Sequence, residues 1–147
     1  MDLDEHYRGL ERMYSLANCN AAYTNKVAIA KGEARLSLPV DERYFHAAGA
    51  VHGHLYFKML DDAAYFAAAS LVPGFFVVTV SFTTYLVRAI DKGTMIAHGT
   101  VMHQSSNLII AESVVTDEAG KQIARGSGTF MKAAKKLGDV KGYSATS

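Results

Sequence analysis

The stretch that decides the fold is residues 54–71, HLYFKMLDDAAYFAAASL. It contains no proline or glycine and is rich in alanine and leucine, which favours an α-helix. Its apolar residues fall on nearly every side of that helix, and a helix of this kind is surrounded by protein. With Gly53 at its start, we predict a long central helix over residues 53–71 that only a curved sheet or another subunit can cover.

A proline-glycine pair separates this helix from the next element. The nearly uncharged run from Ala63 to Val80 is long enough to suggest a membrane span. Pro73 and Gly74 interrupt it, because proline lacks a backbone N–H and glycine permits conformations that end helices. We therefore interpret the run as a buried helix followed by a buried strand, and we expect no membrane partner.

Strand-like patterns lie on both sides of the helix. Residues 26–38 alternate apolar and polar side chains around Lys31-Gly32, which predicts a hairpin. Four further runs follow the helix and are separated by short turn-forming loops, which predicts an antiparallel meander. A helix wrapped by one antiparallel sheet is an α+β fold. The four runs are Phe75–Ile90, Thr94–His103, Leu108–Thr116 and Gln122–Met131.

Two segments flank this core. An amphipathic pattern predicts an extra helix within residues 1–20, because apolar side chains recur there at spacings of three and four. Residues 134–147 mix lysine, glycine and serine with few large apolar side chains, and we predict a flexible tail there. The 147 residues, 50% hydrophobic and 20% charged, suit one globular domain. We place that domain at residues 1–133.

Charge and cysteine usage narrow the classes of partner. A formal net charge of +1 provides no field for binding nucleic acid or a charged membrane surface. The single cysteine, Cys19, cannot form an internal disulfide, and the first residues lack the basic and apolar parts of a secretory signal. We expect a cytoplasmic protein without a nucleic-acid partner. His52 and His54 are two residues apart and no cysteine joins them, so we predict no metal site.

Residues 46–54, HAAGAVHGH, followed by Asp61, resemble the signature of the PaaI-like branch of hotdog-fold acyl-CoA thioesterases. In that branch an Asn, a Gly and a His-Gly-Gly precede an acidic residue within the helix. The resemblance extends over residues 40–131 and implies a hotdog fold, a curved antiparallel sheet wrapped around a long central helix. Three positions depart from the pattern: His46 replaces the Asn, His54 replaces the second Gly, and Ser106-Asn107 replace a Gly-basic pair.

The resemblance implies catalytic roles for three residues. Thioester hydrolysis needs a donor that polarises the carbonyl and a base or nucleophile for the acyl carbon. Gly53 fits the first role, because N–H groups at a helix start lack partners and the helix dipole favours negative charge there. Asp61 fits the second as general base or nucleophile, with a pKa raised by apolar neighbours. Thr79, or Ser81 if the register shifts, could orient the water.

The spacing of these residues predicts an oligomer. Asp61 lies eight residues after Gly53, about 12 Å along one helix. Two copies packed antiparallel across a two-fold axis could bring the start of one helix near the middle of the other. We therefore expect a homodimer, or a dimer of dimers, with shared sites. No cofactor is expected apart from coenzyme A as part of the substrate.

The expected function is hydrolysis of an acyl-CoA or acyl-carrier-protein thioester, a small-molecule substrate. Two alternatives stay open: a hydroxyacyl-thioester dehydratase or hydratase using His46 with Asp61, and a non-catalytic acyl-CoA binder. The acyl group is also open. His52 and His54 fit a structural role better than a direct catalytic one, and His46 fits a plain loop position as well as a binding role. The candidate substrate-binding residues are His46, His52, His54, Ser106 and Asn107.

Overall fold

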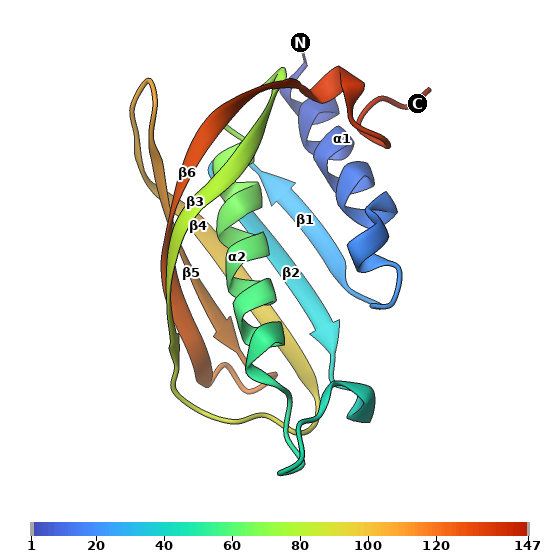
Figure 1. Cartoon of the computed structure of the whole chain (residues 1–147), viewed down its shortest axis with the longest axis vertical. Helices are drawn as coiled ribbons and strands as arrows, with labels where there is room; N and C mark the ends of the chain where they lie inside the picture. Colours follow the sequence, from blue (N-terminus) through green and yellow to red (C-terminus); the bar gives the residue numbers. More distant parts are fainter. Residues whose placement is uncertain (1, 147) are drawn as a thin grey trace.

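The computed structural model describes residues 2–146 as two α-helices and one six-stranded antiparallel sheet (Figure 1). The sheet curves around the longer helix, and the shorter helix lies outside it. This is the α+β layout expected of a hotdog fold. The helices are α1 (Leu3–Leu16) and α2 (Gly53–Ala69), with short 3-10 turns η1 (Asn18–Asn20), η2 (Glu42–Tyr44) and η3 (Leu137–Asp139). The strands are β1 (Lys26–Ala30), β2 (Glu33–Pro39), β3 (Phe75–Leu86), β4 (Thr94–Gln104), β5 (Ile109–Thr116) and β6 (Gln122–Lys136).

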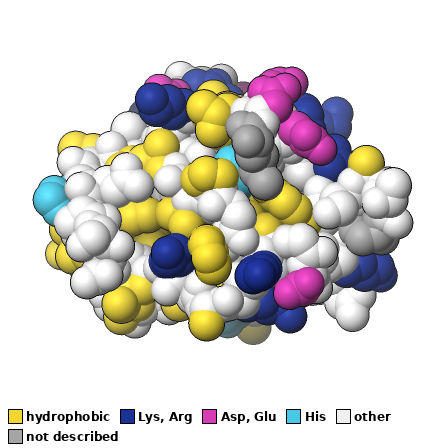
Figure 2. Space-filling model, turned by 90° about the horizontal axis from the view of Figure 1, so that it is seen from above, with side chains coloured by type: hydrophobic (Ala, Val, Ile, Leu, Met, Phe, Trp, Pro, Cys, Tyr) yellow, Lys and Arg dark blue, Asp and Glu magenta, His cyan; other side chains and the backbone are white. Residues whose placement is uncertain are grey.

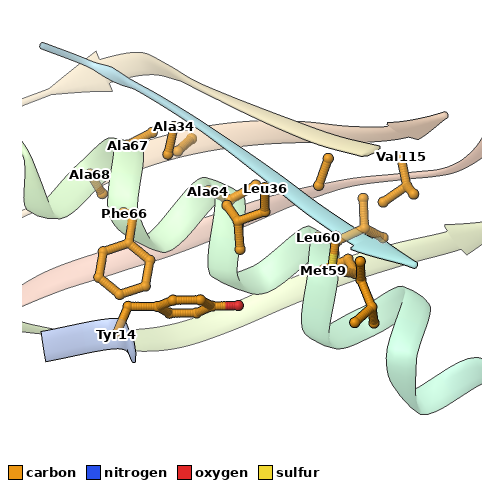
Figure 3. Packing of buried hydrophobic residues seen from close by; sticks show 14 of the residues in the cluster. Tyr14, Ala34, Leu36, Met59, Leu60, Ala64, Phe66, Ala67, Ala68 and Val115 are labelled. Carbon is orange, nitrogen blue, oxygen red and sulfur yellow. The ribbon is translucent and has the colours of Figure 1, made fainter. Parts of the chain in front are cut away.

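Helix α2 fills the concave side of the sheet, as its apolar surface predicts. Small side chains on it lie close to β2, with Ala64 near Leu36 and Ala67 near Ala34 (Figure 3). The closest approach is at Gly99 of β4, where a Cβ atom would lie 2.1 Å from the Ala63 carbonyl oxygen. Only glycine fits there, so Gly99 lets the helix settle directly onto the sheet.

The strand order corrects the predicted meander. The sheet runs β1-β2-β4-β5-β6-β3, so β3 pairs with β6 and not with β4. Residues 87–93 are a crossover instead of a hairpin, and β3 ends at Leu86 instead of Ile90. The cause lies at the end of α2, which delivers the chain to the far edge of the sheet. There the Leu137 N–H donates to the Gly74 carbonyl at 3.0 Å and sets β3 beside the end of β6.

Helix α1 covers one edge of the sheet. The Glu11 carboxylate accepts a hydrogen bond from the Ile29 N–H at 2.8 Å, and Arg8 donates to the Ile29 carbonyl at 3.0 Å. Side chains of α1 thereby satisfy both backbone groups of Ile29 on the outer side of edge strand β1. The predicted N-terminal helix is confirmed, and its role is to block an edge that could otherwise pair with another chain.

The opposite edge is open. Strand β3 is twelve residues long, and within residues 2–146 only β6 pairs with it. Its exposed apolar side chains include Val78 at 41% and Val80 at 55% exposure. A long, uncovered edge strand of this kind favours pairing with another strand.

The C-terminal segment is packed where we expected a flexible tail. Strand β6 continues to Lys136, and Leu137 and Tyr143 are buried. The His6 side chain is fully buried and joins this segment to both helices: Nε2 donates to the Ala69 carbonyl at 3.0 Å, which leaves Nδ1 to accept from the Tyr143 hydroxyl at 2.7 Å. Burial lowers the pKa of His6 and so keeps it neutral.

The surface does not present a field of one sign at this end of the molecule. On the face that carries both termini, basic, acidic and apolar side chains are interspersed (Figure 2).

The uncharged run 63–80 is divided as expected, because α2 ends at Ala69 and Gly74, with φ 89°, precedes β3. Across residues 2–146, no helix combines the length and the hydropathy that a membrane crossing requires.

Candidate active site

Asp61 and Thr79 meet between the middle of α2 and strand β3. The Thr79 hydroxyl donates a hydrogen bond of 3.0 Å to Oδ1 of Asp61. Ser81, the alternative for this role, follows a bulge in β3 that lies between Thr79 and Ser81. The structure therefore brings Thr79 to the predicted acid, and within residues 2–146 Oδ2 of Asp61 accepts no hydrogen bond.

The environment of Asp61 favours its protonated form. Burial raises the pKa of Asp61, and the neighbouring Asp62 charge raises it further. The hydrogen bond from Thr79 and the positive charge of Lys58 act in the opposite direction, but the net effect is a raised pKa. A carboxyl group with a raised pKa is a better base near neutral pH than an ordinary aspartate.

Asp62 belongs to a separate polar cluster on the same side of α2. The Lys58 ammonium lies 2.6 Å from Oδ2 of Asp62 and above the rings of Tyr14 and Tyr23, 5.5 and 5.7 Å from their centroids. The Tyr14 hydroxyl hydrogen-bonds to Asp62 and accepts from the Asn25 amide. Burial raises the pKa of both Asp62 and Tyr14. This cluster connects α1 to α2 beside the candidate acid.

Both aspartates face one cavity of about 690 Å³. It lies between the end of α1 with η1, the middle of α2, the start of β3, and the segment after η3. Thr79 and the Lys58–Asp62 pair lie on its polar side. Its apolar wall consists of Met13, Leu16, Phe66, Phe76, Val77 and Val140.

Gly53 begins α2 at the other end of the candidate site. Its N–H forms no hydrogen bond within residues 2–146. His52 is the N-cap: its Nδ1 accepts from the His54 N–H at 3.1 Å and lies 2.8 Å from Nδ1 of His54. The His46 ring is 6.5 Å from that of His52. The three predicted histidines thus gather around a helix N-terminus that has a free donor.

Gly53 and Asp61 lie along the partly exposed side of α2, with Phe57, 42% exposed, between them.

Over residues 48–124, the sequence matches the model of one protein family, whose description is the thioesterase superfamily. The match covers slightly more than half of the chain and contains Gly53, Asp61 and Thr79. This chain belongs to the thioesterase superfamily. A comparison with curated proteins found no significant match.

Solved structures confirm the hotdog fold of this superfamily member. The Escherichia coli PaaI protein from the phenylacetic acid degradation operon is 19% identical, with a TM-score of 0.82 over 90% of this chain and 96% of that one. A putative esterase from Mycobacterium tuberculosis is 25% identical, with a TM-score of 0.73 over 80% and 97%. A Streptococcus mutans protein bound to acetyl CoA is 18% identical, with a TM-score of 0.72 over 82% and 97%.

Ser106 and Asn107 are not brought to Asp61 within one chain of this thioesterase-superfamily member. They lie at the exposed tip of the β4–β5 hairpin, which is at the opposite end of the sheet from the start of α2 (Figure 1). Instead, the hairpin tip lines a different cavity, together with Leu71 and Lys132. Among residues 2–146, no group of three or more His, Cys, Asp or Glu side chains could hold a metal ion.

Sequence reasoning did not identify Tyr14, Lys58 or Cys19 as neighbours of the acid. Tyr14 and Cys19 come from a segment far away in sequence, and only the packing of α1 against α2 brings them there. The Lys58–Asp62 pair carried a usable signal, because side chains four residues apart on a helix are neighbours. The T-shaped contact of Tyr14 with Phe66, with ring centroids 5.2 Å apart, holds α1 in place.

Proposed function

We propose that this protein hydrolyses acyl-CoA thioesters at a site shared between two subunits, with Asp61 of one subunit and the Gly53 N–H of its partner acting on the same carbonyl. The observation that carries the proposal is the Asp61–Thr79 pair beside the open edge of the sheet. Membership of the thioesterase superfamily supports the reaction class. The acetyl CoA bound to the Streptococcus mutans structure supports coenzyme A as the carrier.

The two edges of the sheet support a dimer through β3. Helix α1 packs along β1, and its side chains bond both backbone groups of Ile29, so that edge is covered. The β3 edge is long and exposes apolar side chains. Two β3 strands paired about a two-fold axis would continue the sheet and place two antiparallel α2 helices side by side. The N-terminus of each helix would then face the middle of the other.

The proposed reaction uses the free oxygen of Asp61. As general base it takes a proton from water while the water oxygen bonds to the acyl carbon, and the carbonyl oxygen becomes an oxyanion. The free Gly53 N–H and the helix dipole stabilise that oxyanion. The oxyanion then re-forms the carbonyl and the C–S bond breaks. The leaving thiolate takes up the proton that Asp61 removed from water, so the products are a carboxylic acid and a thiol and Asp61 is again a carboxylate. Direct attack by Asp61 would instead form a mixed anhydride that water hydrolyses.

The remaining predicted residues have binding roles in this proposal. His46, His52 and His54 surround the helix start, where they would flank the thioester carbonyl. Ser106 and Asn107, at the hairpin tip, are exposed and are assigned to the outer part of the substrate.

Release of free thiol from an acyl-CoA panel tests this function. We expect Asp61→Asn to lower kcat/KM by about 10²–10⁴-fold, the usual contribution of general base catalysis. Asn keeps an acceptor for Thr79, so the fold should be intact. Asp91→Asn, on an exposed loop, is the matched control and should behave like wild type. A folded wild type that hydrolyses no thioester, or an Asp61→Asn variant of full activity, would overturn the proposal.

A further inference from the structure

The polarity of the residues that line the cavity beside Asp61 bears on which part of a thioester would enter it. Asp61 and Thr79 line it where α2 faces β3, and Asp62 lines it beside α1. Asn18 and Asn20 of η1 also line it. The other lining residues are mostly apolar and come from α1, the C-terminal half of α2, the start of β3 and the segment after η3. A thioester carbonyl at Asp61 would therefore have one substituent directed toward an apolar space within the same chain.

Charge decides which substituent that is. Coenzyme A carries anionic phosphate groups, which need cationic or N–H donors. Of the two lysines in the cavity lining, Lys58 is already bound to Asp62 at 2.6 Å, and Lys141 lies exposed at the rim. Two carboxylates face the same space. The interior thus disfavours phosphate and favours an uncharged, apolar group.

We propose that this cavity receives the acyl group and leaves coenzyme A outside, and that it is matched to apolar acyl groups of medium length and not to acetyl. This inference rests on the proposed function for the position of the thioester. A volume of about 690 Å³ lies within the range of about 300–1,000 Å³ that is typical of pockets for drug-sized ligands. An acetyl group would leave most of the apolar wall uncovered.

Helix α1 contributes to substrate specificity if the cavity holds the acyl group. The Tyr14 ring packs edge-on against Phe66, and its hydroxyl is bonded to Asp62. Met13 and Leu16 are then held opposite α2 as part of the wall. The end of α1 and η1, which a thioester carbonyl at Asp61 would not touch, would therefore determine which acyl groups are accepted.

Cys19 allows a test that does not depend on hydrolysis. It is exposed, lines the cavity, and is the only cysteine in the chain. The rate of its alkylation by iodoacetamide is measured with saturating S-decyl-coenzyme A or S-methyl-coenzyme A, thioethers that cannot be hydrolysed. We expect S-decyl-coenzyme A to slow alkylation by about tenfold and S-methyl-coenzyme A by less than about twofold, because only the long chain fills the cavity. Cys19→Ser provides the blank.

A matched pair of variants on α1 provides the activity readout. Leu16 and Leu3 are 50% and 45% exposed, but only Leu16 lines the cavity. Leu16→Trp should lower kcat/KM for decanoyl-CoA by about tenfold and leave acetyl-CoA little changed, whereas Leu3→Trp should change neither.

The outcomes separate the two claims. Protection of Cys19 by the decyl compound without hydrolysis of any thioester would overturn the proposed function and keep the pocket. Hydrolysis without protection, together with equal effects of Leu16→Trp on both substrates, would overturn the pocket and keep the function.

Discussion

Two adjacent aspartates have different environments because they point to different neighbours. Asp62 is bound by Lys58 and Tyr14, whereas the one hydrogen bond of Asp61 within residues 2–146 comes from Thr79. The sequence predicted a catalytic role for Asp61 through its resemblance to a known motif. It could not assign Asp62 to a cluster with Tyr14, because the two lie far apart in the chain and meet only through tertiary packing.

Asp61→Asn should raise stability while it removes activity. Because the pKa of Asp61 is raised in the folded protein, the folded state binds its proton more readily than the unfolded state does. Stability therefore falls as pH rises from the ordinary aspartate pKa of 3.8 through the raised value. We expect the Tm of Asp61→Asn to exceed that of wild type by a few degrees at about pH 7 and the difference to shrink toward about pH 4. A variant less stable than wild type at neutral pH would contradict the raised pKa.

Lys58→Met should move the acidic limb of the kcat/KM profile to higher pH. Lys58 lowers the pKa of Asp61 directly, and it also compensates the Asp62 charge that raises it. Asp62→Asn should move the same limb to lower pH, and the double variant should lie between the two. If the Lys58–Asp62 pair were purely structural, the two single variants would change kcat/KM or Tm, but they would not shift the acidic limb of the pH profile in opposite directions.

Strands were predictable as elements, but their neighbours were not. Alternation of side chains placed β4 and β5 to within one residue and marked Phe75 and Gln122 as the starts of β3 and β6, but it ended β6 at Met131 instead of Lys136. The partner of β3 depends on where α2 delivers the chain, and alternation contains no information about that. The C-terminal segment was misjudged for a related reason: Leu137 and Tyr143 are isolated apolar residues in the sequence, and only tertiary packing buries them. Tyr143 packs against His6 and Gly9 of α1.

Val80→Lys should weaken self-association. Val80 lies on the open strand β3, and in a β3-paired dimer two lysines would approach each other near the two-fold axis. We expect the dimer dissociation constant to rise by about tenfold or more, because like charges at an interface repel. Met102→Lys, at a similarly exposed position on β4, is the control and should leave association unchanged. Sedimentation velocity measures both, and equal behaviour of the two variants would argue against pairing through β3.

At the scale of the whole molecule, the fold closes one edge and leaves the other open. Helix α1 closes the β1 edge and also forms a wall of the cavity beside Asp61. The open β3 edge carries Thr79, which is bonded to that same acid. Under the proposed function, catalysis therefore requires a dimer. Within one chain, Asp61 and the N–H of Gly53 lie too far apart along α2 to act on the same carbonyl.

The most direct test of the shared site uses mixed dimers, purified through two different tags. A dimer of Gly53→Val with Asp61→Asn keeps one intact site if the site is shared, and should show about half the activity of wild type. A dimer of wild type with the Gly53→Val/Asp61→Asn double variant carries the same substitutions but spoils both shared sites, and should be inactive. The reverse result, an inactive first dimer and a half-active second, would place the whole site within one chain and contradict the account.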